Sequence, residues 1–123
     1  MSTMTWEVLV APEFQSWLAR LPQQGKKAVA VDLEVLREYG PQLGRPLVDH
    51  IKASKHGNMK ELRTTSGGNA YRTLFAFDPI RRAVLLIGGD KSGQNQDRFY
   101  KVLIKQADAI YSRHLEQMKK DKP

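Results

Sequence analysis

The chain has 123 residues, of which 41% are hydrophobic and 27% charged, with a net charge of +7 and no cysteine. A chain of this length can bury a core without covalent or metal staples, and the composition is that of a folded domain. The lack of cysteine excludes a disulfide framework, a thiol nucleophile and a cysteine-based zinc site, and fits a reducing cytoplasm. We expect one cytoplasmic domain over residues 1–123, without a secretion signal. No membrane span is expected either, since the longest apolar run, 83–89, is far shorter than the roughly 18 residues required.

The positive charge is distributed unevenly along the chain. Residues 1–40 hold four Lys and Arg against five Asp and Glu, residues 41–94 hold nine against four, and residues 95–123 hold seven against four. The excess therefore falls on the central and C-terminal parts. A positive half suggests a polyanion as partner, while a solvated surface with a positive bias would give the same pattern.

The N-terminal part predicts one strand followed by two helices. Residues 6–10 (WEVLV) are typical of a short strand near a sheet edge, and Pro12 suits the first position of a helix. Apolar residues then recur at helical spacing until Pro22 ends the segment. We expect a turn at 23–25 and a second helix at 26–38, the two helices forming an antiparallel hairpin on one face of a sheet.

Three strands are predicted between residues 59 and 91. MKELRT (59–64) and AYRTLFAF (70–77) flank the break SGGN, and RAVLLIGG (82–89) follows the break DPIR. Both breaks are rich in turn-forming residues. The last two strands are almost wholly apolar, so they should be adjacent, antiparallel and central, with both faces covered. The residues expected to be buried there are Leu74, Phe75, Leu85 and Ile87.

The remaining segments predict a weak strand and a last helix. Residues 47–57 are compatible with a short strand and a polar turn. Asn95 or Asp97 suits the cap of a helix that reaches about Met118. The predicted order is β-α-α-β-β-β-α. This is an α+β fold, a small antiparallel sheet with the N-terminal helix hairpin on one face and a C-terminal helix.

Several kinds of catalytic site are excluded by the residue pattern. No serine lies in a Gly-x-Ser-x-Gly setting, and the GGDK segment (88–91) lacks the spacing of a phosphate-binding Walker loop. Asp78 and Asp90 end different strands and face turns, so they do not make a paired-acid site. The histidines lack zinc-ligand spacing and are expected in solvent or at a helix edge: His50, His56 and His114. We therefore expect no metal and no cofactor.

The residues left for chemistry are cations and a phenol: Lys60, Arg63, Arg72, Lys91, Arg98 and Tyr100. Such a set suits metal-independent RNA cleavage, in which the ribose 2′-OH attacks its own phosphate to give a 2′,3′-cyclic phosphate and a 5′-OH. Guanidinium groups can neutralise the phosphorane, and Lys or Tyr can act as acid or base where nearby cations lower their pKa. Lys52 and Lys55 are further candidates for RNA binding. Lys and Arg on edge strands also prevent aggregation, so the pattern alone leaves both interpretations open.

Three segments together resemble the RelE/HigB toxins of bacterial and phage toxin–antitoxin pairs, in particular the phage-derived HigB-like branch: NMKELRTT, AYRTLFAFDPIRRAVLLIGGDKSG and RFYKVLIKQADAIYSRHL. The resemblance covers nearly the whole chain. It implies a small α+β fold and cleavage of messenger RNA, in many members in the ribosomal A site. It also implies a cognate antitoxin, usually a helix-turn-helix protein, so that DNA would be contacted only through the antitoxin.

The resemblance also implies roles for particular residues. Arg63 and Arg72 match phosphate-contacting arginines, and Lys60 matches a basic position on the same strand. Lys91 matches the cation after the fourth strand, and Tyr100 a catalytic or base-stacking tyrosine. No residue is a clear match for the general base.

Other interpretations of these residues remain open. Arg63 could pair with Glu61 on the same strand face, Tyr100 could belong to the helix core, and Arg81 and Arg82 are expected in solvent at a turn. The alternative function is a protein of the same fold that binds RNA or the ribosome without cleaving. A DNA-binding regulator is disfavoured because no helix-turn-helix spacing occurs.

Overall fold

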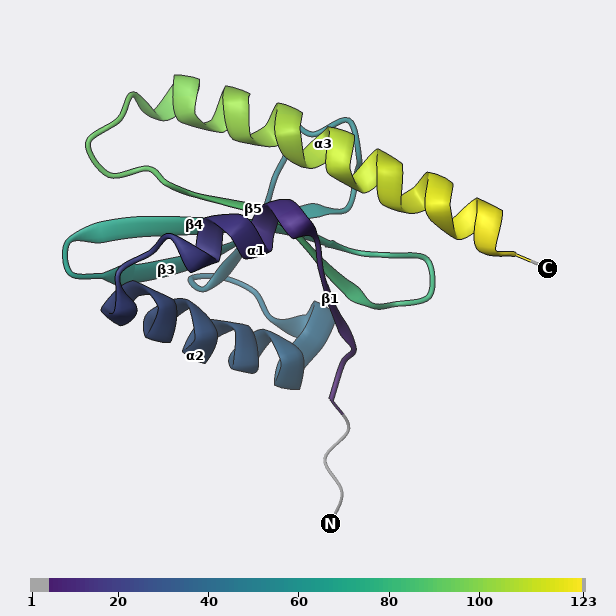
Figure 1. Ribbon diagram of the computed structural model, residues 1–123, viewed down its shortest axis with the longest axis horizontal. Coiled ribbons are helices and arrows are strands. Elements are labelled where there is room, and N and C mark those ends of the chain that lie inside the picture. The colour runs from purple at the N-terminus through teal and green to yellow at the C-terminus, as the bar shows by residue number, and fades with distance from the viewer. Residues whose placement is uncertain (1–4, 123) are drawn as a thin grey trace, which may run out of the picture.

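The computed structural model describes residues 5–122 and shows a five-stranded sheet with helices on both faces (Figure 1). The strands are β1 (Val8–Val10), β2 (Val48–His50), β3 (Met59–Ser66), β4 (Asn69–Phe77) and β5 (Ala83–Asp90). The helices are α1 (Pro12–Ala19), α2 (Gln23–Tyr39), the 3-10 helix η1 (Gly40–Gln42) and α3 (Gln96–Asp121). The predicted α+β class is confirmed. The segment 47–57 supplies β2, a strand that the predicted element order lacked.

The sheet order is β1-β5-β4-β3-β2. β4 and β5 are adjacent and antiparallel in the interior of the sheet, as predicted, and β3 and β2 continue the antiparallel pairing. β1 pairs in parallel with β5, so the prediction of a wholly antiparallel sheet was wrong at this edge. The chain between β1 and β5 includes α1, α2 and three strands, which provides the long connection that a parallel pair requires.

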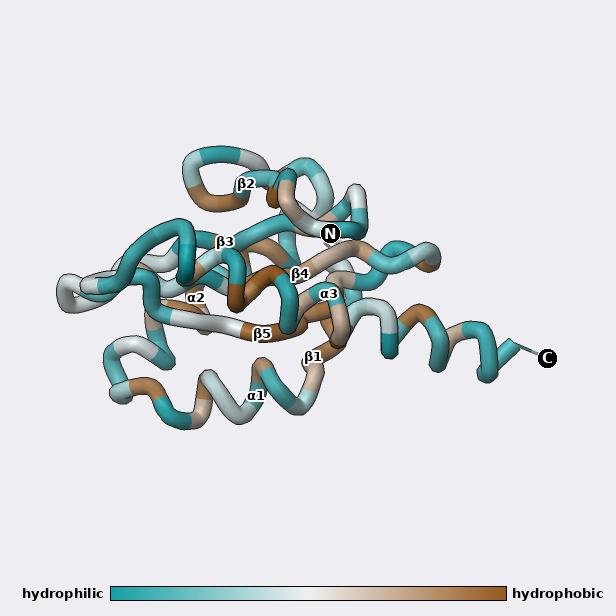
Figure 2. Tube along the Cα trace, turned by 90° about the horizontal axis from the view of Figure 1, so that it is seen from above, coloured by the Kyte–Doolittle hydropathy of each residue, from teal (hydrophilic) through white to brown (hydrophobic). Residues whose placement is uncertain are grey.

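Two hydrophobic cores lie on opposite faces of the sheet, and β5 is among the most hydrophobic stretches of the chain (Figure 2). α1 and α2 cover one face, as predicted, with Phe14, Trp17, Val29 and Leu36 against Leu62, Phe75 and Leu85. α3 covers the other face, with Phe99, Leu103, Ala107 and Ile110 against Met59, Leu74, Val84 and Leu86. Three of the four predicted core residues are buried, but Ile87 is only partly so. A bulge in the β4–β5 pairing places Leu86 in the fully buried position instead.

Two adjacent glycines allow both helical layers to approach β5. A side-chain carbon at Gly88 would collide with the indole of Trp17 on α1, and one at Gly89 would lie 2.9 Å from the ring of Phe99 on α3. Glycine therefore serves close packing on both faces at this point of the strand. The contact with Phe99 holds the beginning of α3 over β5, next to the polar cluster described below.

The helix boundaries depart from prediction at two places. α2 begins at Gln23 because Pro22 takes the N-cap position, so the turn predicted at 23–25 was wrong. α3 is capped by Asn95, whose side chain accepts a hydrogen bond of 2.9 Å from the backbone N–H of Arg98, and it runs to Asp121. None of the helices in residues 5–122 combines the length and the apolar character needed to cross a membrane.

Candidate active site

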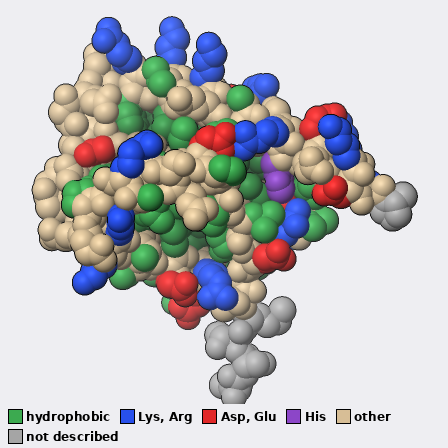
Figure 3. Space-filling model, viewed as in Figure 1, with side chains coloured by type: hydrophobic (Ala, Val, Ile, Leu, Met, Phe, Trp, Pro, Cys, Tyr) green, Lys and Arg blue, Asp and Glu red, His purple; other side chains and the backbone are tan. Residues whose placement is uncertain are grey.

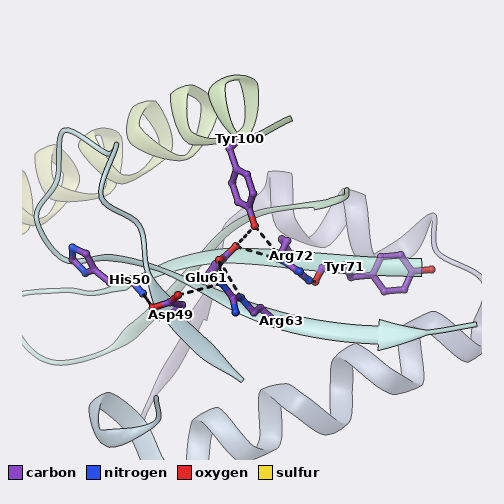
Figure 4. Close-up of polar contacts among 7 residues, drawn as sticks. All are labelled: Asp49, His50, Glu61, Arg63, Tyr71, Arg72 and Tyr100. Atoms are coloured by element: carbon purple, nitrogen blue, oxygen red, sulfur yellow. Dashed lines mark hydrogen bonds and ion pairs between the residues drawn. The ribbon is translucent and has the colours of Figure 1, made fainter. Parts of the chain in front are cut away.

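Three elements bring four polar side chains together on the face of the sheet that α3 covers (Figure 4). Glu61 and Arg63 lie two residues apart on β3, so they point to the same face. Arg72 lies opposite Arg63 on β4, and Tyr100 reaches down from the second turn of α3. We call these four residues the Glu61 cluster. Two arginines opposite each other repel, and the carboxylate of Glu61, which contacts both, offsets that repulsion.

Glu61 is the centre of the cluster. Its Oε1 accepts a hydrogen bond of 2.6 Å from the Tyr100 hydroxyl and lies 3.6 Å from Nε of Arg72. Its Oε2 accepts bonds of 3.2 and 3.1 Å from Nε and Nη2 of Arg63. Arg72 Nε also donates to the Tyr100 hydroxyl at 3.2 Å. Within the described part of the chain, both carboxylate oxygens are thus engaged by side chains alone.

The cluster is closed on one side and open on the other. Glu61 and Arg72 are buried, with 4% and 8% of their surface exposed, and such charges are tolerated only because they pair. Arg72 is also held by a bond of 3.0 Å from Nη1 to the carbonyl of Tyr71. Arg63 and Tyr100 are only partly buried. An anion from solvent would therefore meet Arg63 and Tyr100 first.

Tyr100 is a neutral hydrogen-bond donor in this setting. Burial and the Glu61 carboxylate raise the pKa of Tyr100, and the opposing effect of Arg72 does not cancel the rise. The expectation that neighbouring cations favour a phenolate is therefore corrected. Burial is the largest cause of the raised pKa, and the Glu61 carboxylate adds to it because it lies nearer to the hydroxyl than Arg72 does.

Arg63 lies between two carboxylates. Besides Glu61, it donates from Nη2 to Oδ2 of Asp49 on β2 at 3.2 Å, and Asp49 lies opposite Glu61 in the sheet. The alternative that Arg63 pairs with Glu61 is confirmed as a contact, and a phosphate would compete for the same guanidinium. The sequence interpretation missed both carboxylates as site residues. The two-residue spacing to Arg63 could have identified Glu61, whereas nothing in the sequence pointed to Asp49.

Lys60 lies away from the cluster. Neighbouring positions of a strand face opposite sides, so Lys60 points to the α2 side, where its Nζ is 3.4 Å from the Pro41 carbonyl and 5.8 Å from the centre of the Phe77 ring. The structure thus separates Lys60 from the arginines with which the sequence grouped it. Alternation along β3 could have predicted this separation from Glu61 and Arg63.

The other predicted cations lie in three segments outside the cluster. Lys91 directly follows β5, and its backbone N–H extends the pairing with β4 by one residue. Arg98 is exposed in the first turn of α3, and Lys52 and Lys55 are exposed in the loop between β2 and β3. Lys and Arg side chains project along the edge of the molecule where α3 lies (Figure 3). α3, which supplies Tyr100 to the cluster, therefore also carries an exposed cation, Arg98, in its first turn.

A second buried carboxylate, Asp78, lies at the turn between β4 and β5. Its Oδ1 accepts bonds of 3.1 and 2.9 Å from the backbone N–H groups of Ile80 and Arg82. Its Oδ2 lies 2.9 Å from Nε of Arg82 and 2.9 Å from Nε2 of His114. Burial acts to raise the pKa of Asp78, but these hydrogen bonds outweigh it and lower the pKa. Arg82 was expected in solvent, and the structure instead pairs it with Asp78. His114 packs at the edge of α3 as predicted, partly buried and stacked on Tyr111.

Comparison with protein families and curated relatives gives consistent matches. Residues 16–112 match the family described as "Phage derived protein Gp49-like (DUF891)". The chain is 45% identical over 109 residues to HigB2 of Mycobacterium tuberculosis (strain ATCC 25618 / H37Rv), named as a candidate toxin, across 88% of this chain and 54% of that protein. It is 44% identical over 93 residues to HigB3 of the same organism, also named as a candidate toxin, across 76% of this chain and 79% of that protein. The chain thus spans about half the length of HigB2.

A solved structure has a similar fold. A chain in the crystal structure of the archaeal RelE-RelB complex from Pyrococcus horikoshii OT3 aligns with a TM-score of 0.53 over 73% of this chain and 99% of that chain. The sequence identity is 22%, so this likeness concerns the fold alone.

Proposed function

We propose that this chain, which belongs to the phage-derived Gp49-like family and is related to HigB toxins as its sequence resemblance predicted, is the toxin of a toxin–antitoxin pair that cleaves messenger RNA without a metal ion. The observation that carries the proposal is the Glu61 cluster. It places two guanidinium groups and a neutral phenol around one carboxylate, each with an atom within 3.6 Å of a carboxylate oxygen. These are the groups that 2′-OH attack on a neighbouring phosphate requires.

The two arginines stabilise the charge that develops on phosphorus. Arg63, the more exposed of the two, exchanges its bonds to Glu61 for bidentate bonds to the phosphate. Arg72 is buried and held by the Tyr71 carbonyl, so its guanidinium is already oriented when substrate arrives. Lys91 and the exposed cations Arg98, Lys52 and Lys55 attract the flanking phosphates.

The carboxylate and the phenol move the protons. Glu61 takes the proton from the 2′-OH as this oxygen bonds to phosphorus. The phosphorus–5′-oxygen bond then breaks, and Tyr100 donates its proton to the 5′-oxygen. The raised pKa of Tyr100 suits an acid rather than a base. The proton held by Glu61 returns to Tyr100 along their 2.6 Å hydrogen bond, which restores the starting state.

The proposed partner is an antitoxin, of helix-turn-helix type by the family resemblance, that covers the basic face of the sheet or α3 with acidic side chains. Complementary charge favours this surface, since Arg98, Lys101 and Lys105 are exposed on α3. Hydrogen exchange of the chain with and without the purified antitoxin should show protection in β3–β5 or α3. Protection confined to residues 13–38 would contradict this placement.

The decisive experiment is induced expression with primer extension on a translated message. Wild-type protein should arrest growth and leave RNA with a 2′,3′-cyclic or 3′-phosphate and a 5′-OH. Arg72→Ala should reduce cleavage by about 10²–10³-fold, the scale for removal of one transition-state donor. Arg72→Lys should recover only part of the loss, because a point charge lacks the bidentate fork.

Lys60→Ala is the matched control, since it removes one positive charge from the opposite face of β3, and it should cleave like wild type. Products with a 5′-phosphate would contradict the chemistry. Growth arrest without cut messages would favour the alternative, a non-cleaving module that binds RNA or the ribosome.

A further inference from the structure

A groove of about 440 Å³ runs along α3 beside Tyr100, a volume within the range of small-ligand sites. One wall is a single face of α3: Asp97, Tyr100, Lys101, Ile104, Lys105 and Asp108. These positions recur at spacings of three and four residues, as one side of a helix requires. The other wall is the loop between β2 and β3, through Ala53.

The loop wall is held in place by α3. The Asp108 carboxylate accepts bonds of 2.5 Å from the Ser54 hydroxyl and 3.1 Å from the backbone N–H of Lys55. His56 lies 3.0 Å from the Ser112 hydroxyl and packs edge-on against Tyr111, rather than lying in solvent as expected. The groove therefore has two fixed walls, and the oxygens of Asp108 are already engaged.

The other charged side chains that line the groove are available to bind a ligand. Among residues 5–122, the side chains of Asp97, Lys101 and Lys105 have no hydrogen bond or ion pair. Tyr100 lines the groove, while its hydroxyl reaches Glu61 at 2.6 Å. Tyr100 thus lies between the groove and the rest of the Glu61 cluster, so a ligand in the groove would lie next to that cluster.

We propose that this groove binds the base of the nucleotide at the cleaved phosphate and that Asp97 selects bases with N–H donors, guanine above all and uracil least. The proposal rests on the proposed function, because the Glu61 cluster would hold the phosphate. Tyr100, which is only partly buried, offers an aromatic ring for stacking, and Lys101 and Lys105 attract neighbouring phosphates.

The preference follows from the chemistry of a carboxylate. An ionised Asp accepts hydrogen bonds and donates none. Guanine presents N1–H and the N2 amino group side by side, so it can make two bonds to Asp97. Adenine and cytosine present one amino group each. Uracil presents a single N–H between two carbonyl oxygens, which the carboxylate repels.

The test is an NMR titration of the folded chain with guanosine 3′-monophosphate and uridine 3′-monophosphate. Guanosine monophosphate should bind about 5- to 150-fold more tightly, the range for one good base contact, and should shift the amide signals of Ala53 and Ile104. Asp97→Asn should bring the two dissociation constants together. Asp97→Ala should do the same, which guards against an effect peculiar to the amide.

Glu116→Gln is the matched control, since it removes one negative charge from α3 about 28 Å along the helix from Asp97, and it should keep the preference. Equal affinities in wild type, a preference that survives both Asp97 variants, or unmoved Ala53 and Ile104 signals would overturn the proposal. Message cleavage without base preference would leave the proposed function standing and remove this site. A guanine preference in the titration without message cleavage would support the groove as a base-binding site and contradict the proposed cleavage.

Discussion

Two buried carboxylates, Asp78 and Glu61, each pair with arginine, and they differ in where their donors come from. Asp78 accepts hydrogen bonds from two backbone N–H groups of its own turn and from the side chain of Arg82, four residues along the chain. His114 on α3 also contacts its carboxylate. Within the described residues, Glu61 interacts with side chains only. It accepts hydrogen bonds from Arg63 on its own strand and from Tyr100 on α3, and it forms an ion pair with Arg72 on β4.

The difference predicts that Asp78 contributes to stability alone and that Glu61 also takes part in the proposed cleavage. The side chain of Asp78 is 0% exposed, and two of its hydrogen bonds come from backbone N–H groups of its own turn, which cannot turn away to another partner while the turn is intact. Arg63 has 37% of its side chain exposed, so it can turn from Glu61 to a phosphate while the strand stays in place.

The largest expected effect concerns Glu61. Glu61→Gln should lower message cleavage by about 10²–10⁴-fold, because an amide cannot take the 2′-OH proton. The rate should be measured by primer extension and expressed per folded molecule. Asp49→Asn, which also removes a carboxylate from Arg63, should have a much smaller effect. If Glu61→Gln only lowered stability and left that rate intact, Glu61 would be as structural as Asp78.

Asp78→Asn should have the opposite profile. Loss of the buried charge leaves Arg82 without its partner and should lower the free energy of unfolding by about 3–5 kcal/mol, measured by urea denaturation. Cleavage by the molecules that remain folded should stay at the wild-type level. A variant of normal stability that had lost cleavage would reverse the assignment of the two carboxylates.

Tyr100→Phe tests the phenol separately from the carboxylate. It should lower cleavage by about 10²-fold, the lower end of the range for a general acid, since solvent can replace part of a proton donor's role. The wild-type rate should not increase as the pH approaches 10, because the raised pKa keeps Tyr100 protonated. A rate that climbed there in wild type and not in Tyr100→Phe would indicate a phenolate base.

The smallest effect is the acid sensitivity of the Asp78 turn. The pKa of Asp78 is lowered in the folded state, so its contribution to stability is complete above the unfolded value of about 3.9. That contribution is lost as the pH falls through the lower folded pKa. Urea denaturation below pH 4 should therefore show a steeper fall in stability for wild type than for Asp78→Asn. Parallel curves would mean that Asp78 is not selectively stabilised as the anion.

The sequence-based predictions that the structure confirms rest on local patterns. The nearly unbroken apolar residues of β4 and β5 identified the interior strands, because only strands covered on both faces carry such runs. Asn95, one of the two residues predicted to cap the last helix, caps α3, because a short polar side chain can accept a hydrogen bond from a free N–H group of the first turn. The two-residue spacing of Glu61 and Arg63 already placed both on one face.

Only the tertiary structure decided which distant residues meet. The parallel pairing of β1 with β5 and the meeting of Glu61 with Tyr100 join residues far apart in the chain. Phe99 of α3 packs against Gly89 of β5, and no local pattern predicts that these two residues meet. Periodicity tells which face a side chain takes, because the backbone repeats, whereas the partner it meets there depends on how whole elements pack.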